Sequence, residues 1–120
     1  MEDLKSDPNE FDLIVTGDLG QTGKELLMEL ADKDGLSLSG KITDCGTLIF
    51  DNTTQDVHSG GSGCGCSAIT LCGYLLEQLN GGKLKKILFC GTGALLSPTS
   101  TQQGLTIPGV CHAVCITGGR

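Results

Sequence analysis

Residues 67–80 read SAITLCGYLLEQLN, and this stretch decides the fold class of the 120-residue chain. Its length and composition are those of a helix, and the NGG at residues 80–82 predicts where the helix ends. Its circumference is covered almost completely by apolar or small residues, namely Ala68, Ile69, Leu71, Cys72, Gly73, Tyr74, Leu75, Leu76 and Leu79. A helix that is apolar all round is buried on several sides. We therefore expect a central helix with one side on the chain's own sheet and the other side against a further cover.

Apolar runs on both sides of this helix predict the strands of that sheet. Residues 11–18, FDLIVTGD, and residues 85–91, KKILFCG, are short apolar stretches broken by a glycine, as expected of buried strands. A further strand is expected around residues 47–50, and a last one at residues 110–116, VCHAVCI. This order of strands and helices predicts an α/β fold with a mixed sheet, in which the last two strands run antiparallel.

Residues 21–35, QTGKELLMELADKDG, predict an amphipathic helix between the first two strands. Thr22 is the expected N-cap, Glu25 follows it at the spacing of a capping box, and Gly35 marks the end of the helix. One apolar stripe along this helix consists of Leu26, Leu27, Leu30 and Ala31.

The length of the chain suits a single domain. We expect residues 1–10 to be an exposed lead-in, residues 11–117 to form the domain and residues 118–120 to be a tail. The net charge of −6 and the pI of about 4.6 argue against nucleic acid or an anionic membrane as the main partner. We expect neither a secretory signal nor a membrane span, because the first residues are acidic and the apolar runs are short.

Seven cysteines form an unusually large and odd set for a chain of this length. Cys90, Cys111 and Cys115 lie in apolar runs, where a free cysteine behaves as a small buried hydrophobic residue. We therefore expect reduced thiols and an intracellular protein rather than a disulfide framework.

The segment before the central helix, HSGGSGCG at residues 58–65, is rich in glycine and invites several interpretations. A dinucleotide loop would follow a strand directly, and this segment does not. A metal site would need a second pair of ligands, and the candidates are only His58, Cys64, Cys66 and Cys72. A nucleophilic Cys64 or Cys66 stays open, because the start of a helix lowers the pKa of a thiol. The simplest interpretation is close backbone packing, with amides free to bind a carboxylate or phosphate.

Several motifs together resemble one family. FDLIVTGDLG, DCGTLIFD, GGSGCGCSA and GTGALLSPTSTQQG, the last followed by IPG and HAV, are similar to the stage V sporulation protein AD family of endospore-forming bacteria. The resemblance covers residues 2–116 and implies a thiolase-like fold, in which two similar halves pack around buried central helices. This chain matches the C-terminal half. The resemblance implies that the missing N-terminal half packs on the uncovered side of the central helix.

The resemblance also bears on catalysis. In active ketoacyl synthases of the same superfamily, this half supplies a catalytic histidine and a catalytic asparagine. Their positions fall on Gly17 and Gly61, which have no side chain to transfer a proton or bind an oxyanion, and the nucleophilic cysteine belongs to the other half. The resemblance thus implies a pocket without catalytic side chains, in which the backbone of Thr92 and Gly93 corresponds to the oxyanion-hole turn of the active enzymes. Its expected lining is Asp18, Gly60, Gly61, Ser62, Gly63, Thr92 and Gly93.

The family's role implies binding of dipicolinic acid, its uptake into the developing spore and its release on germination. The implied partners are membrane-embedded stage V sporulation proteins, and the implied location is the periphery of the inner spore membrane in a sporulating cell. Calcium that accompanies the ligand, or lysines of the missing half, would offset the negative charge; no cofactor or metal of the protein's own is implied. Without the missing half, we expect self-association through the central helix. The alternative function is an acyltransferase with a cysteine nucleophile.

Overall fold

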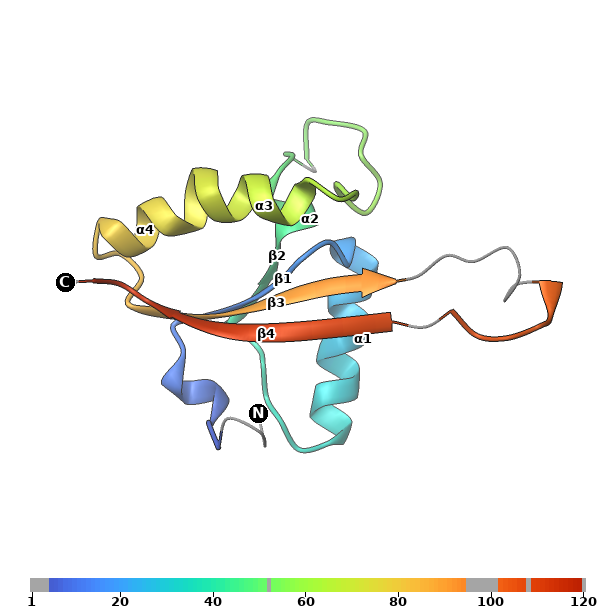
Figure 1. Cartoon of the computed structure of the whole chain (residues 1–120), viewed down its shortest axis with the longest axis horizontal. Helices are drawn as coiled ribbons and strands as arrows, with labels where there is room; N and C mark the ends of the chain where they lie inside the picture. Colours follow the sequence, from blue (N-terminus) through green and yellow to red (C-terminus); the bar gives the residue numbers. More distant parts are fainter. Residues whose placement is uncertain (1–4, 52, 95–101, 108, 120) are drawn as a thin grey trace.

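The computed structural model describes residues 5–51, 53–94, 102–107 and 109–119, and it shows a four-stranded sheet between two sets of helices (Figure 1). The strands are β1 (Leu13–Thr16), β2 (Ile42–Asp44), β3 (Lys86–Ala94) and β4 (Gly109–Thr117). They lie in the order β2-β1-β3-β4. β1 is parallel to β2 and β3, whereas β3 and β4 are antiparallel. The α/β class, the mixed sheet and the antiparallel last pair are thereby confirmed.

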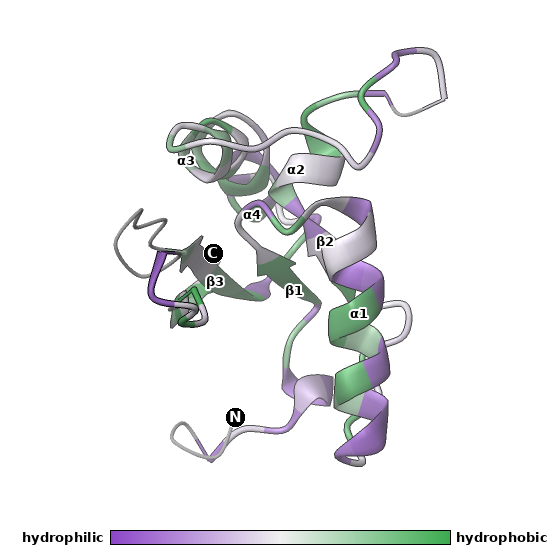
Figure 2. Cartoon of the chain, turned by 90° about the vertical axis from the view of Figure 1, so that its right-hand side faces the viewer, coloured by the Kyte–Doolittle hydropathy of each residue, from purple (hydrophilic) through white to green (hydrophobic). Residues whose placement is uncertain are grey.

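Helices cover both faces of this sheet, as Figure 2 shows from the side. One face carries α1 (Gly20–Lys33), and a short 3-10 helix, η1 (Pro8–Glu10), precedes β1. The other face carries α2 (Cys45–Leu48) and a continuous helix, which we call the central helix. It consists of α3 (Cys66–Thr70), the π-helical segment η2 (Leu71–Leu75) and α4 (Leu76–Asn80). Within the expected lead-in, Pro8 of η1 is buried. The division into a lead-in, a domain and a tail stays a prediction.

Two hydrophobic clusters hold the layers together. The cluster on the α1 side contains Phe11, Ile14, Ala31, Leu38, Leu88 and Cys90. The cluster under the central helix contains Val15, Cys45, Cys66, Leu75, Leu79 and Ile87. Because side chains along a strand alternate between the faces of a sheet, Ile14 and Val15 serve opposite layers.

The central helix is buried along one side only. Leu75 and Leu79 are buried against the sheet, but Ile69 is 62% exposed and Tyr74 is 48% exposed. Further exposed positions on this helix are Ala68, Cys72 and Gly73. The predicted helix is confirmed. Among the described residues, no helix or strand packs on its second side, where a cover was expected. In the part of the chain that the structure describes, the central helix is therefore covered on one side.

The second strand differs from the prediction. Residues 47–50 were the expected strand because TLIF is apolar and partly β-branched, but β2 comes earlier, at Ile42–Asp44. The Asp44 side chain accepts a hydrogen bond from the Gly46 amide at 2.9 Å and so caps α2, which starts at Cys45. Capping by an aspartate after a short strand thus outweighs the strand preference of the residues that follow.

The start of α1 also differs from the prediction. The helix begins at Gly20, and Thr22 is inside it, where its hydroxyl contacts the Ser59 hydroxyl at 3.0 Å. The Glu25 carboxylate accepts a hydrogen bond from the Gln21 side chain at 2.6 Å instead of closing a capping box. The predicted stop at Gly35 is confirmed, since α1 ends at Lys33, Asp34 is its C-cap and Gly35 follows with a φ of +83°. Of the apolar stripe, Ala31 is buried, whereas Leu26 and Leu30 are exposed.

The expected burial of three thiols is only partly correct. Cys90 is buried in β3, as predicted, but Cys111 and Cys115 are exposed in β4. β4 is the last strand in the order of the described sheet, and its residues are exposed except Ile116, which packs against the cluster under the central helix. An apolar strand at the edge of a sheet is not buried by its own composition, because burial needs a neighbouring layer.

Candidate functional site

Asp18 lies in the turn after β1 and brings three segments together. Its carboxylate accepts hydrogen bonds from the Thr92 hydroxyl at 3.2 Å, the Gly63 amide at 3.3 Å and the Ser62 hydroxyl at 3.5 Å. The Asp18 amide donates to the Thr92 hydroxyl oxygen at 3.1 Å. Four of the predicted pocket residues are therefore neighbours, at the carboxyl ends of the parallel strands β1 and β3. Ligands of open α/β sheets commonly bind at such ends.

Gly60 and Gly61 hold the glycine loop, residues 58–65, directly against α2. The Gly61 amide donates a hydrogen bond to the Gly46 carbonyl at 2.7 Å. A Cβ on Gly60 would collide with that same carbonyl, and Gly60 also has a φ of +110°, a conformation that favours glycine. These two predicted residues thus determine where the loop lies rather than supply a functional side chain.

Thr92 and Gly93 lie inside β3, where they pair with Cys111 and Val110 of β4. The chain is extended here rather than turned, because pairing with β4 continues to Ala94. The Thr92 hydroxyl reaches Asp18, and Gly93 is exposed one residue further along the strand. The expected backbone turn at these two residues is therefore wrong, although Thr92 does belong to the cluster around Asp18.

The positions of Gly17 and Gly61 leave no room for side chains. A Cβ on Gly17 would lie 2.8 Å from the Thr92 hydroxyl oxygen and 3.1 Å from the Thr92 amide nitrogen. A Cβ on Gly61 would lie 2.5 Å from a methyl carbon of Ile49 and 3.0 Å from the ring of Phe50. In this arrangement, the space that a histidine or an asparagine would need at these positions is filled by neighbours.

Asp44 is a residue that sequence reasoning missed. It is fully buried at the end of β2, and its carboxylate accepts hydrogen bonds from the Thr16 hydroxyl and from three backbone amides. The available signal was an aspartate that follows Ile42 and Thr43 and directly precedes Cys45 and Gly46, a position at which an aspartate can cap a helix. Two of the three amides, those of Leu19 and Gly20, come from a distant turn, and no local pattern indicates that contact.

The thiols near the glycine loop differ in exposure. Cys64 is exposed, whereas Cys66 is buried at the first position of α3. Burial, together with the negative charges of Asp18 and Asp44, raises the pKa of the Cys66 thiol above its ordinary value. The expected lowering of a thiol pKa by the helix start does not prevail at Cys66. The Cys66 thiol is therefore a poor nucleophile near neutral pH.

The residues considered for a metal site do not form one cluster. His58 is exposed and lies 3.7 Å from the Asp56 carboxylate, and Cys72 is exposed on the central helix, while Cys66 is buried. Within the described part of the chain, no group of three or more His, Cys, Asp or Glu side chains has the arrangement of a metal site.

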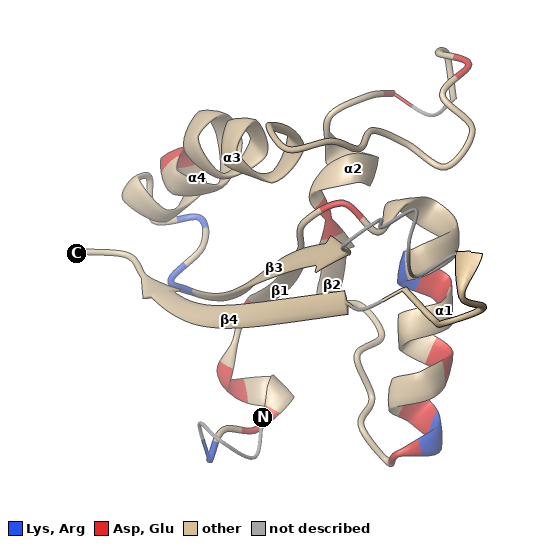
Figure 3. Ribbon diagram, turned by 45° about the vertical axis from the view of Figure 1, so that its right-hand side comes forward, with Lys and Arg blue, Asp and Glu red and all other residues tan. Residues whose placement is uncertain are grey.

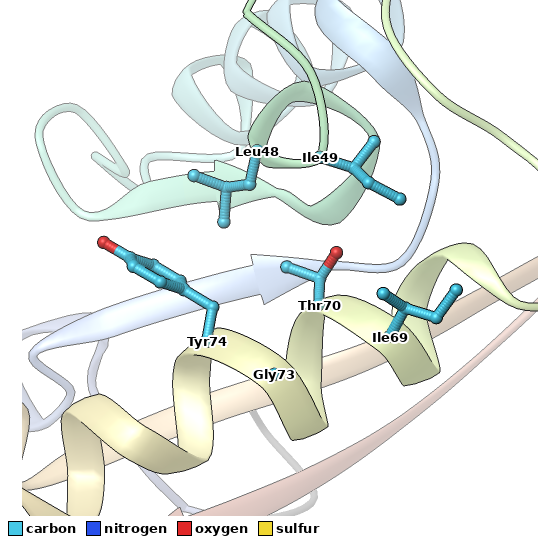
Figure 4. Close-up of a pocket in the computed structure, with 6 residues that line it drawn as sticks. All are labelled: Leu48, Ile49, Ile69, Thr70, Gly73 and Tyr74. Carbon is cyan, nitrogen blue, oxygen red and sulfur yellow. The ribbon is translucent and has the colours of Figure 1, made fainter.

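A groove of about 460 Å³ lies between α2 and the central helix. Figure 4 shows its lining, with Leu48 and Ile49 on one side and the Tyr74 ring and the Thr70 and Ile69 side chains on the other. Gly73 lies on the central helix between Thr70 and Tyr74 and adds no side chain to this wall of the groove. The sequence predicted an uncovered side of this helix but not that α2 would form the second wall.

Comparison with known proteins agrees with these motifs. The model of the family Stage V sporulation protein AD (SpoVAD) matches residues 1–117. The chain belongs to this family. A curated member, Stage V sporulation protein AD of Bacillus subtilis (strain 168), is 42% identical over 113 residues, which are 94% of this chain and 33% of that protein. The chain thus spans about a third of the length of its curated relative.

Membership confirms the family resemblance and makes the chain part of a sporulation family. In the described residues, no helix has both the length and the apolar character needed to cross a membrane. The motif GGSGCGCSA of the family resemblance covers most of the glycine loop and the start of α3. The family model matches residues 1–117, which include every residue of the cluster around Asp18.

Proposed function

We propose that this chain is a non-catalytic ligand-binding module, the C-terminal half of a thiolase-like fold, which binds dipicolinic acid during its uptake into spores and its release. The observation that carries this proposal is the cluster of Asp18, Ser62, Gly63 and Thr92 at the carboxyl ends of β1 and β3. The crowding at Gly17 and Gly61 supports the absence of catalysis, because both positions lack the space for a reactive side chain.

The chemistry of the cluster suits a chelated dicarboxylate better than a free one. Asp18 is a carboxylate, so a dicarboxylate ligand without a cation would be repelled from it. A calcium ion held by the ligand reverses the sign of this interaction, and calcium prefers oxygen ligands such as the Asp18 carboxylate and the nearby hydroxyl groups. We therefore propose that calcium and dipicolinate bind together, with calcium brought by the ligand.

Calorimetry on this chain tests the proposal. Titration with dipicolinate in the presence of calcium should give binding heat, and calcium or dipicolinate alone should give much less. The Asp18→Asn variant should weaken binding by about tenfold or more, because the charge of an oxygen ligand strongly affects calcium affinity. Asp32→Asn, which changes an exposed acidic residue of α1, is the matched control and should bind as the wild type does. Equal affinity of the two variants for calcium and dipicolinate would show that Asp18 does not contribute to the ligand site.

The same module is proposed to work with partner proteins. Figure 3 shows that charged residues gather along α1 and η1, whereas β4 is uncharged. Large apolar side chains are exposed on the side of the central helix and on β4, among them Leu48, Phe50, Ile69, Tyr74, Val110 and Val114. This surface supports a cover by the missing half or by a second copy. Membrane-embedded stage V sporulation proteins, and a position at the inner spore membrane, are part of the same proposal.

A further inference from the structure

Asp44 lies outside the cluster around Asp18, yet its carboxylate binds the segments that form that cluster. Asp44 Oδ1 accepts hydrogen bonds from the Thr16 hydroxyl and from the Leu19 amide at 2.9 Å. Asp44 Oδ2 accepts from the Gly20 amide and the Gly46 amide, each at 2.9 Å. Each oxygen thus has two donors, which satisfies a carboxylate that is fully buried.

The donors come from two different segments. Leu19 and Gly20 directly follow Asp18 in the turn after β1, whereas Gly46 belongs to α2. The Gly46 carbonyl in turn accepts the hydrogen bond of the Gly61 amide at 2.7 Å. A continuous path of hydrogen bonds therefore joins the Asp18 turn to the glycine loop, and Asp44 is the residue at its centre.

Close backbone packing makes this path rigid. The Gln21 amide donates to the Ser59 carbonyl at 2.6 Å, and a Cβ on Gly20 would lie 2.7 Å from that carbonyl oxygen. A Cβ on Gly46 would likewise collide with the Gly61 carbonyl. Loop and turn are thus held together by backbone contacts, and a shift of the turn or of α2 moves the loop with it.

We propose that Asp44 is the positioning residue of the ligand site: its carboxylate holds the turn that carries Asp18 in register with the loop that carries Ser62 and Gly63. Asp44 is buried and acts through these residues rather than on the ligand. The ligand part of this inference rests on the proposed function, whereas the effect on the loop does not.

Amide hydrogen exchange by NMR, combined with calorimetry using calcium and dipicolinate, tests the inference. Asp44→Asn replaces one acceptor oxygen by an NH₂ group, which faces at least one backbone amide donor in either orientation of the side chain. Thr16→Val removes one donor while keeping the side chain's shape. We expect exchange at Gly61 and Gly63 to become faster by about tenfold or more in both variants, with a similar loss of affinity, since hydrogen bonds to charged groups are worth that much. Exchange at Phe89 in β3 should stay unchanged.

Two further variants make the test specific. Thr16→Ser keeps the hydroxyl and should restore slow exchange and binding. Asp12→Asn is the matched control, because the Asp12 carboxylate also accepts two backbone amides, those of Lys85 and Lys86, but does so away from the glycine loop. It should leave exchange at Gly61 and ligand affinity as they are in the wild type.

The outcomes separate the two proposals. If Thr16→Val leaves exchange at Gly61 and Gly63 unchanged, Asp44 does not position the loop, whatever the stability of Asp44→Asn. Equal acceleration at Gly61 and Phe89 would show a general loss of stability and would overturn the inference too. If the wild-type chain binds no ligand while exchange at the loop still responds to Thr16→Val, the proposed function fails and the positioning of the loop by Asp44 stands.

Discussion

Gly61 is buried beside Ile49 and Phe50, and its amide binds the Gly46 carbonyl. The missing side chain is therefore a structural requirement of the loop as well as a feature of the site. A Cβ at this position would lie 2.5 Å from a methyl carbon of Ile49, so Ile49 or the loop would have to move. The consequences of that movement can be measured as stability.

We expect Gly61→Ala to lower the free energy of unfolding by about 1–3 kcal/mol, the usual cost of an overpacked position. Urea denaturation monitored by circular dichroism measures this change. Gly65→Ala is the control, because a Cβ there would lie 3.7 Å from Ile69, and the backbone, with φ of −95° and ψ of −11°, accepts alanine. Equal stability of the two variants would contradict the tight packing of the loop on α2.

The thiols give a second test at the scale of single residues. Incubation of the chain with an acyl-CoA should leave no thioester on Cys64 or Cys66, as measured by mass spectrometry of the intact chain and its peptides. The raised pKa of Cys66 keeps its thiol protonated near neutral pH, and the exposed His58 lies beside Asp56. Cys72, an exposed thiol outside the glycine loop, reports background acylation. A thioester on Cys64 or Cys66 above that background would favour the acyltransferase.

At the scale of elements, the sequence predicted most of what is determined by apolar periodicity. The central helix, β1, β3 and β4 all follow from apolar runs and glycine stops, and these patterns depend on neighbours in sequence. The segment TLIF at residues 47–50 has the composition of a strand, yet it lies in and beyond α2 because Asp44 caps that helix. The cap competes with a weak strand preference, and composition does not indicate which of the two prevails.

The candidate site was predictable only in part. The family resemblance indicated Asp18, Ser62, Gly63 and Thr92, and the structure brings them together. Asp44 was not indicated, because its role depends on amides some 24 residues away in the chain, which only the fold brings near. The exposed leucines of α1 show the same limit, since a helical stripe predicts which residues share a face but not what covers it.

At the scale of the whole molecule, apolar surface remains exposed on the side of the sheet that carries the central helix. Soluble chains seldom leave a large contiguous apolar surface open, and such surfaces mark contacts with other chains. Ile69 projects from the central helix one turn before Gly73, which has open space beside it. Two antiparallel copies of the helix that cross between these residues place Ile69 of each over Gly73 of the other, as a two-fold interface requires.

We therefore expect the chain to self-associate, with a sedimentation coefficient that rises with concentration between the values for a monomer and a dimer. Ile69→Asp should weaken this association by about tenfold or more, because it places a charge at the centre of an apolar contact. Leu26→Asp is the matched control: Leu26 is 55% exposed and apolar too, but it lies on α1, on the other side of the sheet. A wild-type chain that stays monomeric at every concentration, or two variants that weaken association equally, would show that the central helix is not the contact surface.

The charge of −6 opposes association at low salt, so the dimer fraction should also increase with ionic strength, as an apolar interface between like-charged chains requires.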